Sequence, residues 1–271
     1  MPELPEVETT LRGIRPFLLG KTIADIIIRQ RSLRWPVTKG IETSIRGSAI
    51  KEISRRAKYL QFHLDNGSML VHLGMSGSLR VLTQPAVWKK HDHIELKLNS
   101  GNMLRYHDPR RFGSWLWSQS GHWQLEKLGP EPLSEGFDGE YLYRLSKRRQ
   151  VAVKAFIMNN SVVVGVGNIY ASESLFLSGI RPDRPAGRIS KQRYTMLAEN
   201  IKITLKRAID RGGTTLRDYS NGNGDPGYFK QELFVYARNG LPCVNCLSQL
   251  TEKRIGQKQC LLYAMPSLSE P

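Results

Sequence analysis

The chain has 271 residues, 40% of them hydrophobic, so it can bury a core in one to three domains and is not a disordered chain. Its 40 Lys and Arg outnumber 24 Asp and Glu, which gives a formal net charge of +16. No apolar run reaches 18 residues and the start lacks a signal-peptide pattern, which excludes a typical membrane span and predicts a cytoplasmic protein.

The chain begins MPELPEVE, an acidic segment in a basic protein. Residues 4–19 predict a helix, because Pro5 suits a first helical turn and the carboxylates of Glu6 and Glu8 suit the positive end of the helix dipole. For Glu8 we expect no role beyond this one.

Residues 21–130 are rich in predicted strands. Their segments alternate between polar and apolar residues or are β-branched, with turn residues between them, and this predicts a β-sandwich or barrel. The segments are ADIIIRQ, KYLQFHL, SMLVHLGMSGSLRVL, HIELKL and MLRYH.

The pattern changes at LGPEPLSEG (128–136), whose prolines and glycines predict a linker. Helical spacing follows over residues 140–210. The polar segment at 220–227 contains GNGDPG, a G-x-G-x-x-G match, but it follows a helix and not a strand, so we interpret it as a flexible loop. The segment VGVGN (164–168) precedes a predicted helix and is either a phosphate-binding helix start or a tight turn between helices.

Basic residues are spread along the chain, as in RSLRWP, ISRRAKY, DPRRFG and SKRRQ, with aromatic residues among them. This favours nucleic acid as the partner, since cations bind phosphate and rings contact bases; the alternative is a generally cationic protein. Segment DPRRFG (108–113) is either a base-reading and wedging loop or a hairpin with a solvated arginine pair and a core Phe. His91 and His93 lack an obvious third metal ligand, which favours a DNA contact or a plain surface strand.

The cysteines Cys243, Cys246 and Cys260 all lie in the last 30 residues. Their clustering indicates a metal site more than a disulfide framework.

Several of these segments occur in a fixed order, namely MPELPEVE, RRAKYL, HLGMSGSLR, DPRRFG, VVVGVGNIYASESLF, PGYFKQELFVYARNG and a C-terminal Cys-x-x-Cys. Together they resemble the formamidopyrimidine-DNA glycosylase (Fpg, MutM) family, bacterial enzymes that remove oxidised purines such as 8-oxoguanine. The related endonuclease VIII family typically begins MPEGPE. Leu4 and the long 217–227 loop therefore favour the purine-specific branch.

The resemblance implies an α+β multidomain fold. We expect an N-terminal catalytic β-sandwich with a leading helix over 1–131. A helical helix–two-turns–helix domain for DNA binding would follow over 136–225, and a degenerate zinc-finger-like β-hairpin over 234–271.

The resemblance also gives the acidic start a function. Once Met1 is removed, Pro2 would be a free secondary amine that attacks the sugar C1′ and forms a Schiff base. Glu3 would act as the acid/base that opens the deoxyribose ring, with Glu6 in support. Lys58 in RRAKYL matches the proton donor of β-elimination.

Other positions match DNA contacts of the family. Met75, Arg110 and Phe112 would fill the gap left by an everted base, and Arg110 would recognise the orphaned cytosine. The loop around 217–227 would close over the flipped base, and Glu173 would support the element that presents a phosphate-binding asparagine. The remaining expected DNA contacts are His91, Asn168, Lys154, Arg149 and Gln150, the last where the family usually has a basic residue.

The C-terminal segment departs from the family pattern C-x2-C-x16-C-x2-C, a four-thiolate zinc site. Counting from Cys246 places Tyr263 and Pro266 at the third and fourth ligand positions. Cys260 lies three residues early and is the one candidate for a third ligand. An ordinary four-ligand zinc site is therefore not expected. Lys258 takes the place of the finger arginine, which keeps the charge but not the bidentate fork.

Together these observations predict a bifunctional DNA glycosylase and abasic-site lyase of the bacterial cytoplasm, associated with the nucleoid and monomeric. Its partner would be double-stranded DNA with oxidised bases or abasic sites. The alternatives are a lesion-binding protein impaired by its degenerate finger, an endonuclease VIII-like enzyme for oxidised pyrimidines, and an RNA-binding protein.

Overall fold

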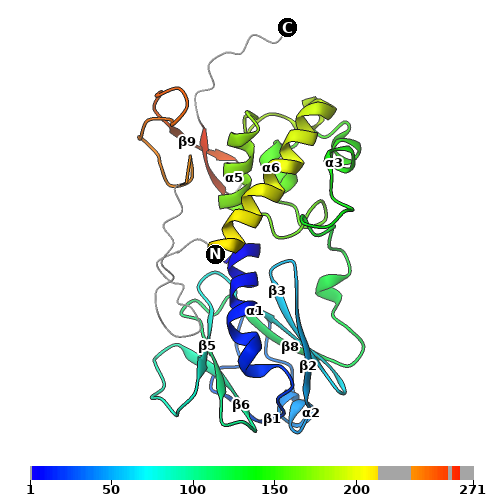
Figure 1. Ribbon diagram of the computed structural model, residues 1–271, viewed down its shortest axis with the longest axis vertical. Coiled ribbons are helices and arrows are strands. Elements are labelled where there is room, and N and C mark those ends of the chain that lie inside the picture. The colour runs from blue at the N-terminus through cyan, green and yellow to red at the C-terminus, as the bar shows by residue number, and fades with distance from the viewer. Residues whose placement is uncertain (1, 213–232, 256–257, 263–271) are drawn as a thin grey trace. The chain divides into compact units, whose positions relative to one another are not determined.

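The computed structural model describes residues 2–212, 233–255 and 258–262, the last range as backbone only. These residues divide into two compact units, which Figure 1 shows as ribbons. The first unit holds residues 2–126 and 209–212, and the second holds residues 127–208 with the described residues from 233 onward.

The first unit begins with the predicted helix, α1, which spans Leu4–Leu18. It buries one apolar face, on which Val7, Leu11 and Ile14 are at most 7% exposed. This spacing of three and four residues is that of an amphipathic helix packed on a core. The expected helix over 4–19 is therefore confirmed.

Two four-stranded antiparallel sheets form the β-sandwich that follows the helix, as predicted. One sheet has the order β1-β6-β7-β5 and the other the order β2-β3-β4-β8. Their shared core is apolar and includes Phe62 and Trp115, both fully buried. The strands are β1 Ile23–Ile28, β2 Ile50–Arg56, β3 Tyr59–Leu64, β4 Gly67–His72, β5 Ser78–Leu82, β6 Asp92–Leu98, β7 Met103–His107 and β8 Ser114–Ser118; the short helices α2 Ile41–Ile45 and η1 Trp123–Leu125 complete the unit.

The second unit is helical over residues 127–208, and its last helix, α6, continues to Asp210. The segment 128–136, predicted to be a linker, packs into this unit: the Gly129 N–H donates to the Asn160 carbonyl at 2.8 Å, and the Val164 N–H donates to that of Pro130 at 3.2 Å. Its helices are α3 Gly139–Ser146, α4 Val153–Ile157, α5 Asn168–Leu177, η2 Ala186–Arg188 and α6 Lys191–Asp210.

The last described residues form an antiparallel hairpin of β9 Thr251–Ile255 and β10 Lys258–Leu262. The expected lesion-closing loop at 217–227 lies outside the described residues, as do Tyr263 and Pro266. Within the described part of the chain, no helix is long and apolar enough to cross a membrane.

Candidate active site and nucleic-acid interface

The start of helix α1 brings together three of the residues proposed for the chemistry. Pro2, Glu3 and Glu6 are buried, and the two glutamates are 2% and 1% exposed. The Glu3 N–H donates to Glu6 Oε2 at 2.8 Å, so the Glu6 carboxylate closes the first turn back onto the N-cap residue.

Lys58 lies in the tight turn between β2 and β3, beside Ala57, whose φ of +55° is left-handed. Arg55 holds this turn. Its guanidinium donates to the Ala57 carbonyl at 3.1 Å and to Glu8 Oε2 on α1 at 2.9 Å. Glu8 therefore does more than support its own helix: it ties the strand that carries the Lys58 turn to α1.

Three exposed side chains lie on two neighbouring loops of the first unit. Met75 is 40% exposed on the loop between β4 and β5, and Phe112 is 47% exposed on the loop between β7 and β8. Arg110 on the second loop donates to the Met75 sulfur at 3.6 Å. The alternative of a hairpin with a core Phe is wrong, because Phe112 faces solvent. We call Met75, Arg110 and Phe112 the wedge.

His91 precedes β6 and belongs to a group of histidines in the same sheet. Its ring centroid lies 6.4 Å from that of His93 and 5.8 Å from that of His107. His93 is 7% exposed and contacts the Asp108 carbonyl at 2.8 Å through Nε2. A plain surface strand is therefore wrong for His93. Among the described residues, no group of three possible metal ligands is present.

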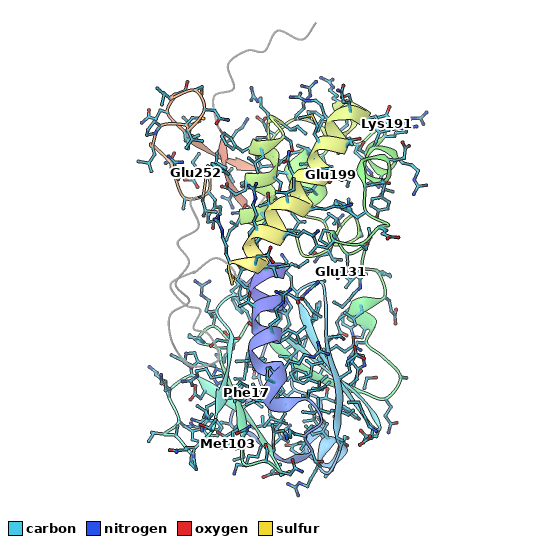
Figure 2. The ribbon with its side chains drawn as sticks, viewed as in Figure 1. Phe17, Met103, Glu131, Lys191, Glu199 and Glu252 are labelled. Atoms are coloured by element: carbon cyan, nitrogen blue, oxygen red, sulfur yellow. The ribbon has the colours of Figure 1, made fainter. Side chains whose placement is uncertain are left out.

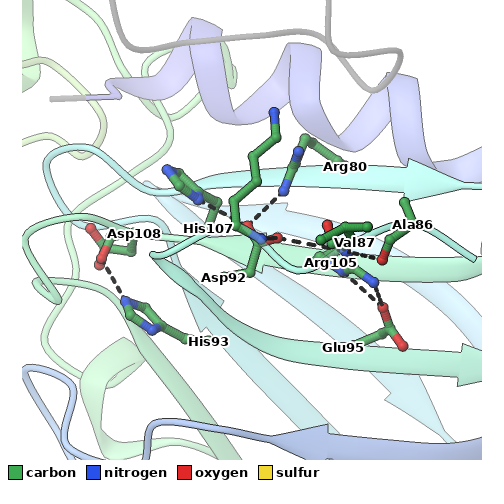
Figure 3. A network of polar contacts seen from close by, with 10 residues as sticks. Arg80, Ala86, Val87, Asp92, His93, Glu95, Arg105, His107 and Asp108 are labelled. Carbon is green, nitrogen blue, oxygen red and sulfur yellow. Dashed lines mark hydrogen bonds and ion pairs between the residues drawn. The ribbon is translucent and has the colours of Figure 1, made fainter.

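Next to His91, Asp92 is 2% exposed and accepts from Arg80 at 2.6 Å and from His107 Nδ1 at 2.9 Å (Figure 3). Burial alone would raise the pKa of Asp92. The hydrogen bonds from Lys89 and His107 and the charge of Arg80 outweigh it, and the pKa is lowered.

Lys154 and Asn168 lie in the second unit and are joined by a chain of hydrogen bonds. The Lys154 ammonium is 1% exposed and donates to Ser172 Oγ at 2.8 Å, and that hydroxyl donates to the Asn168 carbonyl at 2.8 Å. Asn168 begins α5 after Gly165, whose φ is +78°. The segment VGVGN (164–168) is thus both a tight turn and the start of a helix. Asn168 Oδ1 has no hydrogen-bond partner among the described residues.

Arg149 and Gln150 lie exposed in the turn between α3 and α4. The Arg149 carbonyl accepts from the Gly187 N–H at 2.8 Å, which fixes the backbone and leaves both side chains in solvent.

Cys243 and Cys246 lie in one tight turn. The Cys243 N–H donates to the Ser248 carbonyl at 2.8 Å, the Asn245 N–H donates to Cys243 Sγ at 3.5 Å, and Leu247 has a left-handed φ of +61°. Hydrogen bonds from Ser248, and then from Cys243, lower the pKa of the Cys246 thiol. Two cysteines in such a turn fit one half of a tetrahedral zinc site.

The other half of that site falls on residues further along the chain. Cys260 and Lys258 lie on β10, whose side chains are outside the described part of the chain. Tyr263 and Pro266, at the expected third and fourth ligand positions, are also outside it.

Glu173, expected to support the element that presents Asn168, places its carboxylate against the C-terminal segment. It is 3% exposed and accepts three successive backbone N–H groups, from Phe234 at 2.8 Å, Val235 at 3.0 Å and Tyr236 at 2.8 Å. Burial raises the pKa of Glu173, and the three N–H groups partly oppose the rise.

Sequence models of two domains match the chain. The formamidopyrimidine-DNA glycosylase N-terminal domain matches residues 1–115, and the H2TH domain of the same glycosylase matches residues 128–220. The formamidopyrimidine-DNA glycosylase of Stutzerimonas stutzeri (strain A1501) is 56% identical over 260 residues, which cover 95% of this chain and 96% of the relative. That of Pseudomonas aeruginosa (strain LESB58) is 55% identical with the same coverage.

Solved structures agree with the sequence relatives. The crystal structure of the MutM (Fpg) protein from Thermus thermophilus has a TM-score of 0.86 at 34% identity and covers 97% of both chains. The Lactococcus lactis Fpg mutant G226P, in complex with DNA containing Fapy-dG, has a TM-score of 0.89 at 30% identity and covers 96% of this chain and 97% of its own. The Lactococcus lactis Fpg in complex with abasic-site DNA has a TM-score of 0.88 at 30% identity with the same coverage.

Proposed function

The chain belongs to the formamidopyrimidine-DNA glycosylase family, and we propose that it excises oxidised purines from double-stranded DNA and then cleaves the abasic site. The family match covers nearly the whole chain, which makes it a DNA glycosylase. The complexes of its structural relatives with lesion-containing and abasic-site DNA support DNA as the partner. The formal charge of +16 suits this polyanion.

The observation that carries the proposal is the burial of Pro2 and Glu3 at the start of α1. An α-amino group has a pKa near about 8, so roughly a tenth of it is neutral and nucleophilic at pH 7. In the proposed reaction the Pro2 nitrogen, freed by removal of Met1, attacks the sugar C1′. The bond from C1′ to the base breaks, and the base leaves with the proton that the Pro2 nitrogen loses. When the sugar ring opens, an iminium ion (a Schiff base without an N–H) links Pro2 to C1′.

The neighbouring residues would move the protons. Glu3 would protonate the ring oxygen as the sugar opens, and Glu6 would hold the backbone of Glu3 in place through the observed hydrogen bond. Loss of a C2′ proton then expels the 3′-phosphate, and a second elimination expels the 5′-phosphate. Lys58 would supply protons in these eliminations, and hydrolysis of the Schiff base restores the amine.

The DNA contacts and domain boundaries complete the proposal. The wedge would enter the base stack, while His91, Asn168, Lys154, Arg149 and Gln150 would bind phosphates or the lesion. Lys258, in place of the finger arginine, would contact DNA phosphate at the lesion.

Where zinc binds, Cys243 and Cys246 would hold it together with Cys260, and the metal would stabilise the fold of the C-terminal hairpin. The boundaries 1–131, 136–225 and 234–271 stay predictions.

The test compares excision from duplexes that carry 8-oxoguanine opposite cytosine or thymine glycol. Faster excision of 8-oxoguanine, with strand cleavage at the product, supports the proposal. Preference for thymine glycol would favour an endonuclease VIII-like enzyme. Tight binding without excision would favour a lesion-binding protein.

A further inference from the structure

The two loops that carry the wedge meet at one buried side chain, which the sequence did not single out. Asp108, at the start of DPRRFG, is 0% exposed. Its Oδ1 accepts from Ser76 Oγ at 3.0 Å and from the Arg110 N–H at 3.3 Å. Its Oδ2 accepts from the Tyr106 hydroxyl at 2.8 Å and from the Gly113 N–H at 3.0 Å.

These four donors come from both loops and from strand β7, which leads into the second loop. Ser76 directly follows Met75, while Arg110 and Gly113 enclose Phe112. One carboxylate thus fixes the backbone on both sides of the wedge. Hydrogen bonds to a charged acceptor are about twice as strong as neutral ones, which suits a group that must hold two loops together.

The backbones of the two loops are also in direct contact. A Cβ added at Gly74 would lie 2.5 Å from the Gly113 nitrogen, so the loops can approach this closely because position 74 is a glycine. A Cβ at Gly113 would collide with the Tyr106 hydroxyl. Burial raises the pKa of Tyr106 well above its usual value, so the phenol stays protonated and donates to Asp108 at any working pH.

From this geometry we propose that Asp108 is a positioning residue that holds Met75, Arg110 and Phe112 in register for insertion into the DNA base stack. The proposal rests on the proposed function, because it assigns a structural cause to the eversion step. Opening a base pair costs a few kcal/mol, and a wedge offsets this cost only if its tips are already in place when the duplex arrives.

The substitution Asp108→Asn tests the proposal with almost no change in volume. The amide has one acceptor oxygen and one NH₂ group, and each carboxylate oxygen faces one hydroxyl and one backbone N–H. The hydroxyl can rotate and accept a hydrogen bond, but the N–H of Arg110 or Gly113 cannot. Whichever way the amide turns, the loop between β7 and β8 loses one of its two backbone anchors, at Arg110 or at Gly113.

The matched control is Asp92→Asn in the same sheet. Like Asp108, Asp92 is a buried carboxylate that accepts several hydrogen bonds, among them those from Arg80 and His107 (Figure 3). Its side chain holds neither of the two loops that carry the wedge. A general loss of stability should therefore affect both variants alike.

Two rates separate eversion from chemistry: single-turnover excision of 8-oxoguanine from a paired duplex, and cleavage of a duplex with a ready-made abasic site, which has no base to evert. We expect Asp108→Asn to lower the first at least tenfold and the second less than threefold. Asp92→Asn should leave the ratio of the two rates as in the wild type. Equal losses in both rates for Asp108→Asn would overturn the proposal. A wild type that excises nothing would instead contradict the proposed function.

A second readout needs no chemistry. A 2-aminopurine next to the lesion in the same strand, with cytosine kept opposite the lesion, becomes fluorescent when the stack is opened. We expect Asp108→Asn at saturating concentration to give less than half of the wild-type rise. If that variant does not fold, Ser76→Ala removes one of the four donors and should lower the ratio of the two rates about threefold. An unchanged ratio or an unchanged fluorescence rise would overturn the proposal.

Discussion

Both units use one buried carboxylate to fix the backbone of a neighbouring segment, but the surroundings of the two carboxylates differ. Asp108 lies in the sandwich, next to a large core that holds its sheets together without it. Glu173 holds residues 234–236 beside a small cluster of buried residues, namely Phe176, Val235, Cys243 and Leu250. From this difference we infer that loss of Asp108 should loosen only the tips of the two wedge loops. Loss of Glu173 should instead release the whole segment that begins at residues 234–236.

The largest effect is expected from Glu173→Gln. The amide keeps one acceptor oxygen for three backbone N–H groups, and each buried N–H left without a partner costs about 1–3 kcal/mol. Residues 233–255 should become accessible to protease and to hydrogen exchange, and excision should fall at least 100-fold. Glu199→Gln, an exposed residue on α6 labelled in Figure 2, is the control and should change neither. Full protection of 233–255 in Glu173→Gln would contradict the comparison.

A smaller effect is expected from acid, and it should act on the first unit. His72 Nδ1 accepts the Gly74 N–H at 2.9 Å, next to Met75, so the ring is neutral there. Burial, and then the charges of Lys58 and Arg34, lower the pKa of His72 from 6.5 to about 4. Between these values the unfolded chain binds the proton and the folded chain does not, so stability falls as the pH drops from 6.5 to 4, by up to about 3 kcal/mol.

Urea unfolding across this pH range measures the effect. His72→Asn keeps an acceptor for Gly74 but does not titrate, so its free energy of unfolding should depend less steeply on pH than that of the wild type. Parallel curves for the two proteins would show that His72 is not the group responsible.

The smallest effect is expected from a chelator. Glu173 and the stacked rings of Phe176 and Phe234, 5.8 Å apart, contact residues 234–236 independently of the two cysteines. Protection of the amides of residues 234–236 from hydrogen exchange should stay unchanged in EDTA. Zinc released in equal amount to the protein, together with loss of that protection, would show that the metal and not Glu173 anchors this segment.

Much of the fold could be predicted from the sequence, because the spacing of apolar residues follows the buried face of each helix or strand. Helix α1 and strands such as β1, β3 and β6 lie where alternation or helical spacing placed them. Strand β2, Ile50–Arg56, was not predicted: its polar residues, half-buried or exposed, disturb the alternation. Strand β8, Ser114–Ser118, was also not predicted. It directly follows DPRRFG, and that segment was interpreted as a loop motif without a strand after it.

The site was less predictable, for a physical reason. Asp108 had a usable signal, since an Asp before Pro often caps the turn that follows with its own side chain. The partners of Glu173 had none, because they are backbone N–H groups 61 to 63 residues away and every residue except proline carries one. Motif resemblance thus assigned Glu173 to the support of a neighbouring element, but it could not show which backbone N–H groups its carboxylate holds.

The most direct test of the proposed chemistry is borohydride reduction during turnover of a duplex with 8-oxoguanine opposite cytosine, followed by mass mapping of the trapped protein. A chain with an N-terminal extension, which leaves Pro2 inside a peptide bond, is the control. We predict one covalent adduct at Pro2 in the processed protein and none in the extended one. An adduct on a lysine such as Lys58, or excision without any adduct, would contradict amine catalysis by Pro2.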